Sequence, residues 1–492
     1  MLITFTALYL FVAIVIGLLA ATKVKNMGDY VSAGRSLPIW MVTAMVFAIW
    51  FGAETVLGVP AEFLQDGLGG IIADPFGAAL CLILFGVFLA RKLYRMNLLT
   101  LGDFYRIRFN RNVELIASVA IAVSYLGWVS AQIMALGIVF NVLSDGSISV
   151  FNGILIGTGV VLIYTLFGGM WSVAVTTFVQ MIVIVLGLLF IAWYLSGMTG
   201  GVMPVIEHAA QAERFVFMPD LNTIAMLAFM SALLTMGLGS IAQQDVFQRA
   251  NTAKNESIAA WGTISGGLIY LVFAAVPIFL GYSAFLINPD LVNHFMAIDA
   301  QLVLPYLVKE HLPLYAQVIF YGALLSVIMS TASATMLAPS VIISENILKD
   351  FIKGLSDRYL LLLTRGVVIA FALLVAIYTL WSLEQETSIH KMVENAYKVT
   401  LVVAFVPLVA GLYWKKASNG GALLGIALGV VTWLSLEYLF PSLEESLPAH
   451  FIGFFMAIAG MILGSYLWPK KPAPEAVQPA DDVTPISPAQ PG

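Results

Sequence analysis

The chain has 492 residues, of which 60% are hydrophobic and only 10% charged, with a formal net charge of −5. Soluble domains are about 45–50% apolar and about 25% charged, so this composition excludes a single water-soluble core and indicates a protein embedded in a lipid bilayer. No basic tract suggests a nucleic-acid partner, and the one cysteine, Cys81, excludes a disulfide framework and a cysteine metal cluster.

Apolar runs of about 20 residues, the length that crosses a bilayer, recur along the chain and predict thirteen spanning helices. The first run lacks the basic start of a signal peptide, so we expect it to be retained. The expected spans are 2–22, 38–63, 68–90, 113–143, 149–167, 172–196, 222–244, 259–284, 315–345, 359–383, 393–414, 420–440 and 447–468. The remaining segment, 469–492, is rich in proline without an apolar run, which predicts a disordered cytoplasmic tail.

The basic residues orient these spans. With the N-terminus outside, all but four of the 23 Lys and Arg fall on the cytoplasmic side, and the exceptions are Arg214, Lys309, Lys391 and Lys398. Lys and Arg are concentrated in the cytoplasmic loops of membrane proteins. The sequence therefore predicts a multi-pass protein of the cell membrane, plasma or inner, with its N-terminus outside and its C-terminus in the cytoplasm.

Two spans contain glycine interruptions at comparable depth. The second span reads AIWFGAETVLG around Gly52, and the seventh reads LLTMGLGSIAQQD around Gly237 and Gly239. Interrupted helices in matching places of two halves indicate the binding site of a secondary transporter, although glycines also permit close helix packing. We expect two inverted five-helix repeats between one leading and two trailing helices. The expected divisions are 1–30, 31–198, 199–416, 417–468 and the tail 469–492.

The ninth span, LLSVIMSTASATMLAPS, carries a group of hydroxyl side chains. Helical spacing places Ser326, Ser330 and Ser333 on one face, with Thr331 adjoining. Such hydroxyls, together with carbonyls freed where another helix unwinds, supply the oxygen ligands that a small hard cation prefers. The alternative is that these hydroxyls bond to carbonyls of their own helix or join neighbouring helices.

Five segments resemble the sodium/solute symporter family, which includes transporters of proline, sugars, sialic acid and choline. They are DYVSAGRSLP, NLLTLGDFYRIRF, YTLFGGMWSVAVTTFVQ, QQDVFQRA and SVIMSTASA. The resemblance implies an all-α integral membrane protein with the inverted-repeat fold of amino-acid transporters. It also implies Na⁺ as the coupling ion, bound by the carbonyls of Ala48, Phe51 and Val327 and by the hydroxyls of Ser330 and Thr331.

The chain departs from the family pattern at two positions. Where many members carry an aspartate that contributes to a second sodium site, this chain has Thr177, so a candidate second cation site rests on Thr177 and Ser333. Trp50 stands where proline-type members carry an aspartate, and the WFG segment resembles choline-type members without settling the substrate. Gln244 and Asp245 match a motif at the inner end of the seventh span and are expected to belong to a gate.

Ionisable residues inside the spans are energetically costly and usually functional. Glu54 is expected to face a central cavity and bind a cationic part of the substrate or a proton, or else to be a structural carboxylate. Lys398 is expected to bind a substrate carboxylate, or to neutralise Glu54 or Glu394. A Glu54–Lys398 pair would favour a zwitterionic substrate, Glu54 alone a cation and Lys398 alone an anion. Asp74 is either part of an external vestibule or a solvated helix start.

These observations predict a sodium-coupled symporter that works by alternating access and has no organic cofactor. Its expected substrate is a small polar organic solute such as an amino acid, a quaternary amine, a monocarboxylate or a sugar. Besides Glu54 and Lys398, the expected substrate contacts are Trp50, Thr55, Met236, Gly239 and Tyr397. The alternative is a proton-coupled symporter that uses Glu54, and a membrane sensor or a channel is less expected. The spans show no nucleophile–base pair or metal motif of an enzyme.

Overall fold

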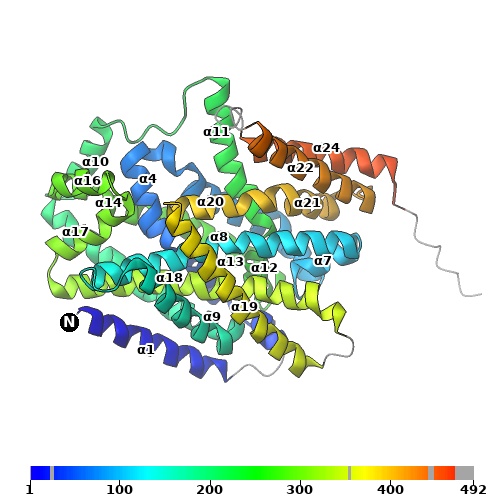
Figure 1. Cartoon of the computed structure of the whole chain (residues 1–492), viewed down its shortest axis with the longest axis horizontal. Helices are drawn as coiled ribbons and strands as arrows, with labels where there is room; N and C mark the ends of the chain where they lie inside the picture. The colour runs from blue at the N-terminus through cyan, green and yellow to red at the C-terminus, as the bar shows by residue number, and fades with distance from the viewer. Residues whose placement is uncertain (1, 23–26, 353–355, 441–447, 471–492) are drawn as a thin grey trace, which may run out of the picture.

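The structure, a computed structural model, describes residues 2–22, 27–352, 356–440 and 448–470, and nearly all of this part is helical (Figure 1). Most of the predicted tail, 469–492, lies outside the described residues. Helices of ten or more residues are α1 (Leu2–Ala21), α3 (Ile39–Trp50), α8 (Arg111–Leu143), α9 (Val150–Met198), α10 (Val202–Gln211), α11 (Thr223–Leu234), α13 (Glu256–Phe273), α18 (Leu314–Ile342), α19 (Asp357–Glu384), α20 (Ile389–Thr400), α22 (Asn419–Leu439) and α24 (Ala449–Leu467). Shorter ones are α2 (Met27–Ser32), α4 (Val59–Asp66), α5 (Ala78–Leu84), α6 (Ala90–Arg95), α7 (Leu101–Arg108), α12 (Gln244–Asn251), α14 (Ala275–Tyr282), α15 (Ala284–Ile287), α16 (Pro289–Met296), α17 (Val303–His311) and α21 (Val406–Tyr413).

Eleven helical segments of the described chain are long and apolar enough to cross a bilayer, judged by length and composition. Two further apolar helices, Ile39–Trp50 and Val150–Ile163, are shorter. They correspond to parts of the expected second and fifth spans, which the structure divides differently: α3 stops within the second span, and α9 runs through both the fifth and the sixth. The total of thirteen crossings remains a prediction.

The change of direction within α9 occurs at Gly169. This residue has a φ of 52°, in the left-handed region that favours glycine. A Cβ there would also lie only 2.5 Å from the ring of Tyr30 in α2. Glycine is therefore required both by the backbone geometry of the bend and by the close approach of α2.

The buried centre is built from segments far apart in the sequence. α3 packs against α9, α13 and α18, while α8 packs against α9, α18 and α20. The second half of α3 and most of α18 are buried, whereas α1 exposes large apolar side chains such as Phe11 and Leu19. α22 and α24 pack mainly on each other at one edge (Figure 1). This distribution, with apolar side chains facing outward, suits a protein surrounded by lipid.

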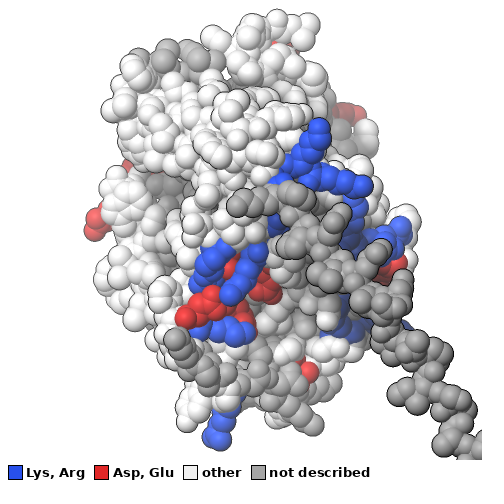
Figure 2. Space-filling view, turned by 90° about the vertical axis from the view of Figure 1, so that its right-hand side faces the viewer, with Lys and Arg blue, Asp and Glu red and all other residues white. Residues whose placement is uncertain are grey.

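Charged side chains gather at one end of the molecule. Figure 2 shows Lys and Arg clustered on the end where α7 lies in Figure 1. Ion pairs near α7 include Arg106 with Asp350 at 2.8 Å and Arg111 with Glu114 at 2.9 Å. The clustering agrees with the expected concentration of basic residues on one side, and the assignment of that side to the cytoplasm remains a prediction.

Candidate ion and substrate site

The centre of the molecule contains a helix break at the position that the sequence indicated. α3 ends at Trp50, and Phe51 leaves helical geometry with φ −83° and ψ 74°. After Gly52 the chain turns helical again, and the Ala53 N–H donates to the side-chain oxygen of Gln132 in α8 at 2.9 Å. A break of this kind frees backbone carbonyls inside the bundle, where a ligand or a side chain has to satisfy them.

Two hydroxyls of α18 meet the end of α3. The Ser330 hydroxyl donates to the Ala48 carbonyl at 2.8 Å and lies 2.9 Å from the carbonyl of Val327. The Thr331 hydroxyl lies 2.9 Å from the Ile49 carbonyl and 3.4 Å from that of Ala48. All five residues are almost completely buried. Four of the five residues predicted to bind sodium thus form one group of oxygens, and Ile49 joins them through a carbonyl that no side-chain signal could reveal.

The remaining hydroxyls of the ninth span point elsewhere. Ser326 bonds to Tyr9 of α1 and to the carbonyl of Gly322 in its own helix. Ser333 bonds to the carbonyl of Ser330 at 3.3 Å. The Ser326 hydroxyl thus contacts the first helix and not the end of α3 that Ser330 meets. Phe51, the fifth predicted sodium residue, is buried at the break directly after α3.

The carboxylate of Glu54 is held by neutral donors beside the break. Trp128 donates its indole N–H at 3.0 Å and Gln132 its amide N–H at 2.6 Å, both from α8. The carboxylate lies over Gly52, where an added Cβ would approach it to 2.3 Å. Pairing with Lys398, one of the alternatives for this residue, is not among the ion pairs of the described residues. Lys398 is half-buried and lies close enough to His450 of α24 to act on it electrostatically.

A second buried carboxylate lies on the other side of the break. Thr55 contacts Asp74 at 3.2 Å and Tyr270 of α13 at 3.0 Å, and the Tyr270 hydroxyl donates to Asp74. Asp74 is almost fully buried, which excludes a solvated helix start. Among the described residues, the recorded ion pairs include neither Asp74 nor Glu54.

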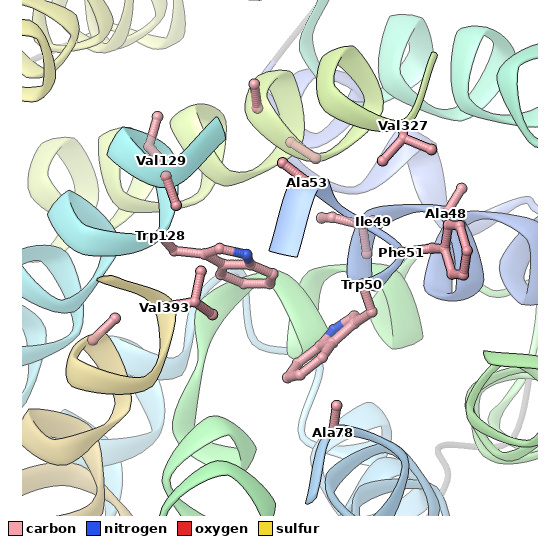
Figure 3. Packing of buried hydrophobic residues seen from close by; sticks show 14 of the residues in the cluster. Ala48, Ile49, Trp50, Phe51, Ala53, Ala78, Trp128, Val129, Val327 and Val393 are labelled. Atoms are coloured by element: carbon pink, nitrogen blue, oxygen red, sulfur yellow. The ribbon is translucent and has the colours of Figure 1, made fainter. Parts of the chain in front are cut away.

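Aromatic rings surround the break. The ring centroids of Trp50 and Trp128 are 5.3 Å apart, those of Trp128 and Tyr397 5.7 Å, and those of Trp50 and Tyr397 6.1 Å. Tyr125 stacks on Trp128 at 6.1 Å. Figure 3 shows Trp50 and Trp128 extending into the same region from the break and from α8. Trp128 and Gln132 were not predicted as site residues, although a Trp and a Gln four residues apart in an apolar span share one helical face.

The seventh span loses α-helical geometry at its glycines: α11 ends at Leu234, directly before the turn that contains Gly237 and Gly239. A π-helical turn covers Thr235–Gly239, a short 3₁₀ turn follows, and the extended residue is Gln243, with φ −83° and ψ 140°. A Cβ on Gly239 would lie 2.6 Å from the carbonyl of Tyr397. The α-helix is thus interrupted at the predicted glycines, and the chain becomes extended shortly afterwards at Gln243. Gly239 also permits close packing against α20. Met236 is buried in the same turn.

The predicted gate residues lie at the start of α12. Gln244 accepts the backbone N–H of Leu101 at the start of α7 at 2.8 Å. The hydroxyl of Tyr125 donates to the Asp245 carboxylate and accepts the Asp245 N–H at 2.8 Å. These bonds tie α12 to α7 and α8.

The two predicted ligands of the candidate second cation site, Thr177 and Ser333, do not share contacts in the way that the oxygens between α3 and α18 do, as far as the described residues show. Thr177 is buried, and its hydroxyl has no hydrogen-bond partner within the described part of the chain. The hydroxyl of Ser333 bonds to its own helix. No bond between the two hydroxyls is recorded among the described residues, so their joint role stays a prediction.

A broken helix in a lipid-facing bundle, with buried oxygens and carboxylates beside the break, defines a membrane transporter. The model of the sodium:solute symporter family matches residues 30–429. The chain belongs to this family, and sodium-coupled symport of a small solute is its class of activity.

Relatives of known function and a solved structure agree with this assignment. The chain is similar to the high-affinity proline transporter of Bacillus subtilis, with 28% identity over 85% of this chain and 88% of that protein. It is also similar to the human high affinity choline transporter 1, with 24% identity over 87% of this chain and 75% of that protein. The fold resembles that of a Na⁺-coupled sialic acid symporter in a substrate-bound outward-open state, with a TM-score of 0.81, 19% identity and coverage of 96% and 99%.

Proposed function

We propose that the protein binds Na⁺ between the end of α3 and α18 and uses it to drive a small organic solute across the membrane by alternating access. The observation that carries this proposal is the contact of the Ser330 and Thr331 hydroxyls with the carbonyls of Ala48 and Ile49. These are uncharged oxygens in a buried place, the ligand type that suits a small hard cation. The carbonyls of Phe51 and Val327 complete the proposed sodium site.

The position of the ion explains how it would act on the transporter. A cation shared between α3 and α18 would hold the two helices together and stabilise one arrangement of the bundle. A ligand shifts a conformational equilibrium only by its difference in affinity between the two states, so loss of the ion would release that arrangement. Moving one charge down a membrane potential supplies about 2.3 kcal/mol per 100 mV.

The proposed architecture follows from the same reasoning. It comprises thirteen crossings, with inverted repeats over 31–198 and 199–416, a leading helix in 1–30 and two trailing helices in 417–468. The N-terminus is placed outside the cell membrane and the C-terminus inside. Gln244 and Asp245 are assigned to the cytoplasmic gate because their bonds to α7 and α8 join the helices at that end. Thr177 and Ser333 are kept as the candidate second cation site.

Sodium-dependent binding and uptake test the proposal. The purified protein is reconstituted into vesicles and supplied with labelled solutes under a sodium gradient, with potassium replacing sodium as the control. Ser330→Ala should raise the sodium concentration for half-maximal uptake at least tenfold. Ser340→Ala is the matched control, because Ser340 is equally buried in α18 but bonds to the Met336 carbonyl of its own helix. Equal sodium dependence in both variants contradicts the proposed site.

A proton-coupled symporter that uses Glu54 predicts a different pattern. Uptake would then follow a pH gradient in the absence of sodium, and Glu54→Gln would abolish this coupling while Ser330→Ala left it intact. The oxygen group between α3 and α18 favours the sodium-driven mechanism.

A further inference from the structure

Several buried polar atoms around the aromatic group have no partner within the described chain. They are the indole nitrogen of Trp50, the hydroxyl of Tyr397, one carboxylate oxygen of Asp245 and the amide oxygen of Gln243. Each of these residues is at most 2% exposed. An unpaired buried polar group costs about 1–3 kcal/mol, so their concentration in one place indicates that a polar ligand binds there. Three of the four residues adjoin the same rings: Trp50 stacks on Tyr397, and Tyr125 links Asp245 to Trp128. Gln243 bonds to Ser124, next to Tyr125 in α8.

Two buried carboxyl groups lie beside this place. Glu54 accepts hydrogen bonds from Trp128 and Gln132. Asp74 accepts them from Thr55 and Tyr270, and His390 also acts on it electrostatically. Asp245 faces the buried Arg249, which offsets its charge. The basic side chain expected to balance Glu54, Lys398, lies toward α24 instead. A buried carboxylate is stabilised by a nearby positive charge, so the Glu54 carboxyl, beside the rings, is a partner for a positively charged solute.

The rings supply a surface that suits an organic cation. Trp50 and Tyr397 are nearly parallel, with an angle of 8° between their planes, and Trp128 is inclined to them by 58° and 62°. An ammonium group is attracted to the faces of aromatic rings within about 6 Å of the centroid, most strongly to Trp. The three rings lie against one another, so an entering cation would have to separate them. It would replace contacts between rings by contacts between the cation and the ring faces.

We propose that the transported solute is a small organic ammonium ion, bound against Trp50, Trp128 and Tyr397 beside Glu54. Its polar group would pair with the free indole N–H of Trp50 and the hydroxyl of Tyr397. This inference rests on the proposed function and narrows its substrate class. A zwitterion fits less well because its carboxylate would approach the carboxyl groups of Glu54 and Asp74, while the buried guanidinium of Arg249 acts on Asp245. A neutral sugar would not use the carboxyl group of Glu54 as an ionic partner.

Binding of matched probes to the purified full chain tests the inference. The probes are choline, its uncharged carbon analogue 3,3-dimethylbutan-1-ol, and L-proline as a zwitterion, each measured by calorimetry with sodium and with potassium. Choline should bind at least tenfold more tightly than the uncharged analogue and than proline. Trp50→Leu and Glu54→Gln should each weaken choline binding at least tenfold and leave the uncharged analogue unaffected. Trp193→Leu is the control, because Trp193 is 70% exposed on α9, away from the break.

The outcomes separate this inference from the proposed function. Sodium-dependent binding of proline or the uncharged analogue in preference to choline overturns the organic cation and leaves sodium coupling standing. Choline binding that is equal in sodium and potassium supports the organic cation and overturns the coupling. Failure of choline to bind the folded protein overturns the inference. If Trp50→Leu does not fold, Trp50→Phe keeps an aromatic face and should retain the preference for choline with reduced affinity.

Discussion

Substitution of Gly52 by alanine tests the geometry of the break directly. The added Cβ would lie 2.3–2.7 Å from the carboxylate of Glu54, well inside ordinary contact distance. The glutamate side chain is flexible, so the cost comes from the hydrogen bonds that it leaves behind. Loss of these bonds leaves the buried donors of Trp128 and Gln132 unpaired, at about 1–3 kcal/mol each, and destabilises the protein by about 2–6 kcal/mol. With an unfolding entropy of about 2.1 cal/mol/K per residue, this corresponds to a melting temperature lower by about 2–6 °C.

The single cysteine provides the assay. Cys81 is completely buried, so a thiol-reactive fluorescent dye reports its exposure when the detergent-solubilised protein unfolds. Gly366→Ala is the control, since nothing lies within 4 Å of its added Cβ in α19 and alanine is favoured over glycine inside a helix. In a Glu54→Ala background the obstructing carboxylate is absent, so Gly52→Ala should cost little. Equal melting temperatures for Gly52→Ala and Gly366→Ala, or an unchanged cost in the Glu54→Ala background, would refute this reasoning.

Three further predictions concern other hydrogen bonds and one ion pair. Gln132→Leu removes the bonds to the Ala53 N–H and to the carboxylate beside it and should destabilise the protein by about 2–4 kcal/mol, measured by the same melting assay. Tyr125→Phe removes the two bonds to the start of α12 and should lower the melting temperature and slow uptake, whereas unchanged values would argue against a gate there. Lys309 lowers the pKa of the Asp145 carboxyl, which lies in the connection after α8. The pair therefore stabilises the folded state at neutral pH, and this stabilisation is lost as the pH falls through the lowered pKa. The difference in melting temperature between the wild type and Asp145→Asn should accordingly shrink in acid.

Some features of this protein could be predicted from its sequence, and others depend on how its helices pack. Composition and the spacing of apolar runs identified a membrane protein, because a bilayer imposes a minimum helix length and forbids exposed charge. The break near Gly52 was also indicated, since a glycine next to a carboxylate in an apolar span is a local departure from an ordinary membrane helix. The glycines of the seventh span carried the same kind of signal, and the α-helix ends directly before them. The close approach of Gly239 to the carbonyl of Tyr397, about 160 positions away, could be known only from the fold.

The sequence alone determined that the chain lies in lipid, that its second span is interrupted and that the ninth carries hydroxyls suited to a cation. Only the tertiary structure decided that Trp128 and Gln132, rather than Lys398, hold the Glu54 carboxylate, and that Asp74 is buried beside the break. The physical reason is that helical periodicity fixes which face a side chain lies on, whereas its partner depends on how helices from distant parts of the chain pack together. Charge balance at the site is therefore a property of the packed bundle.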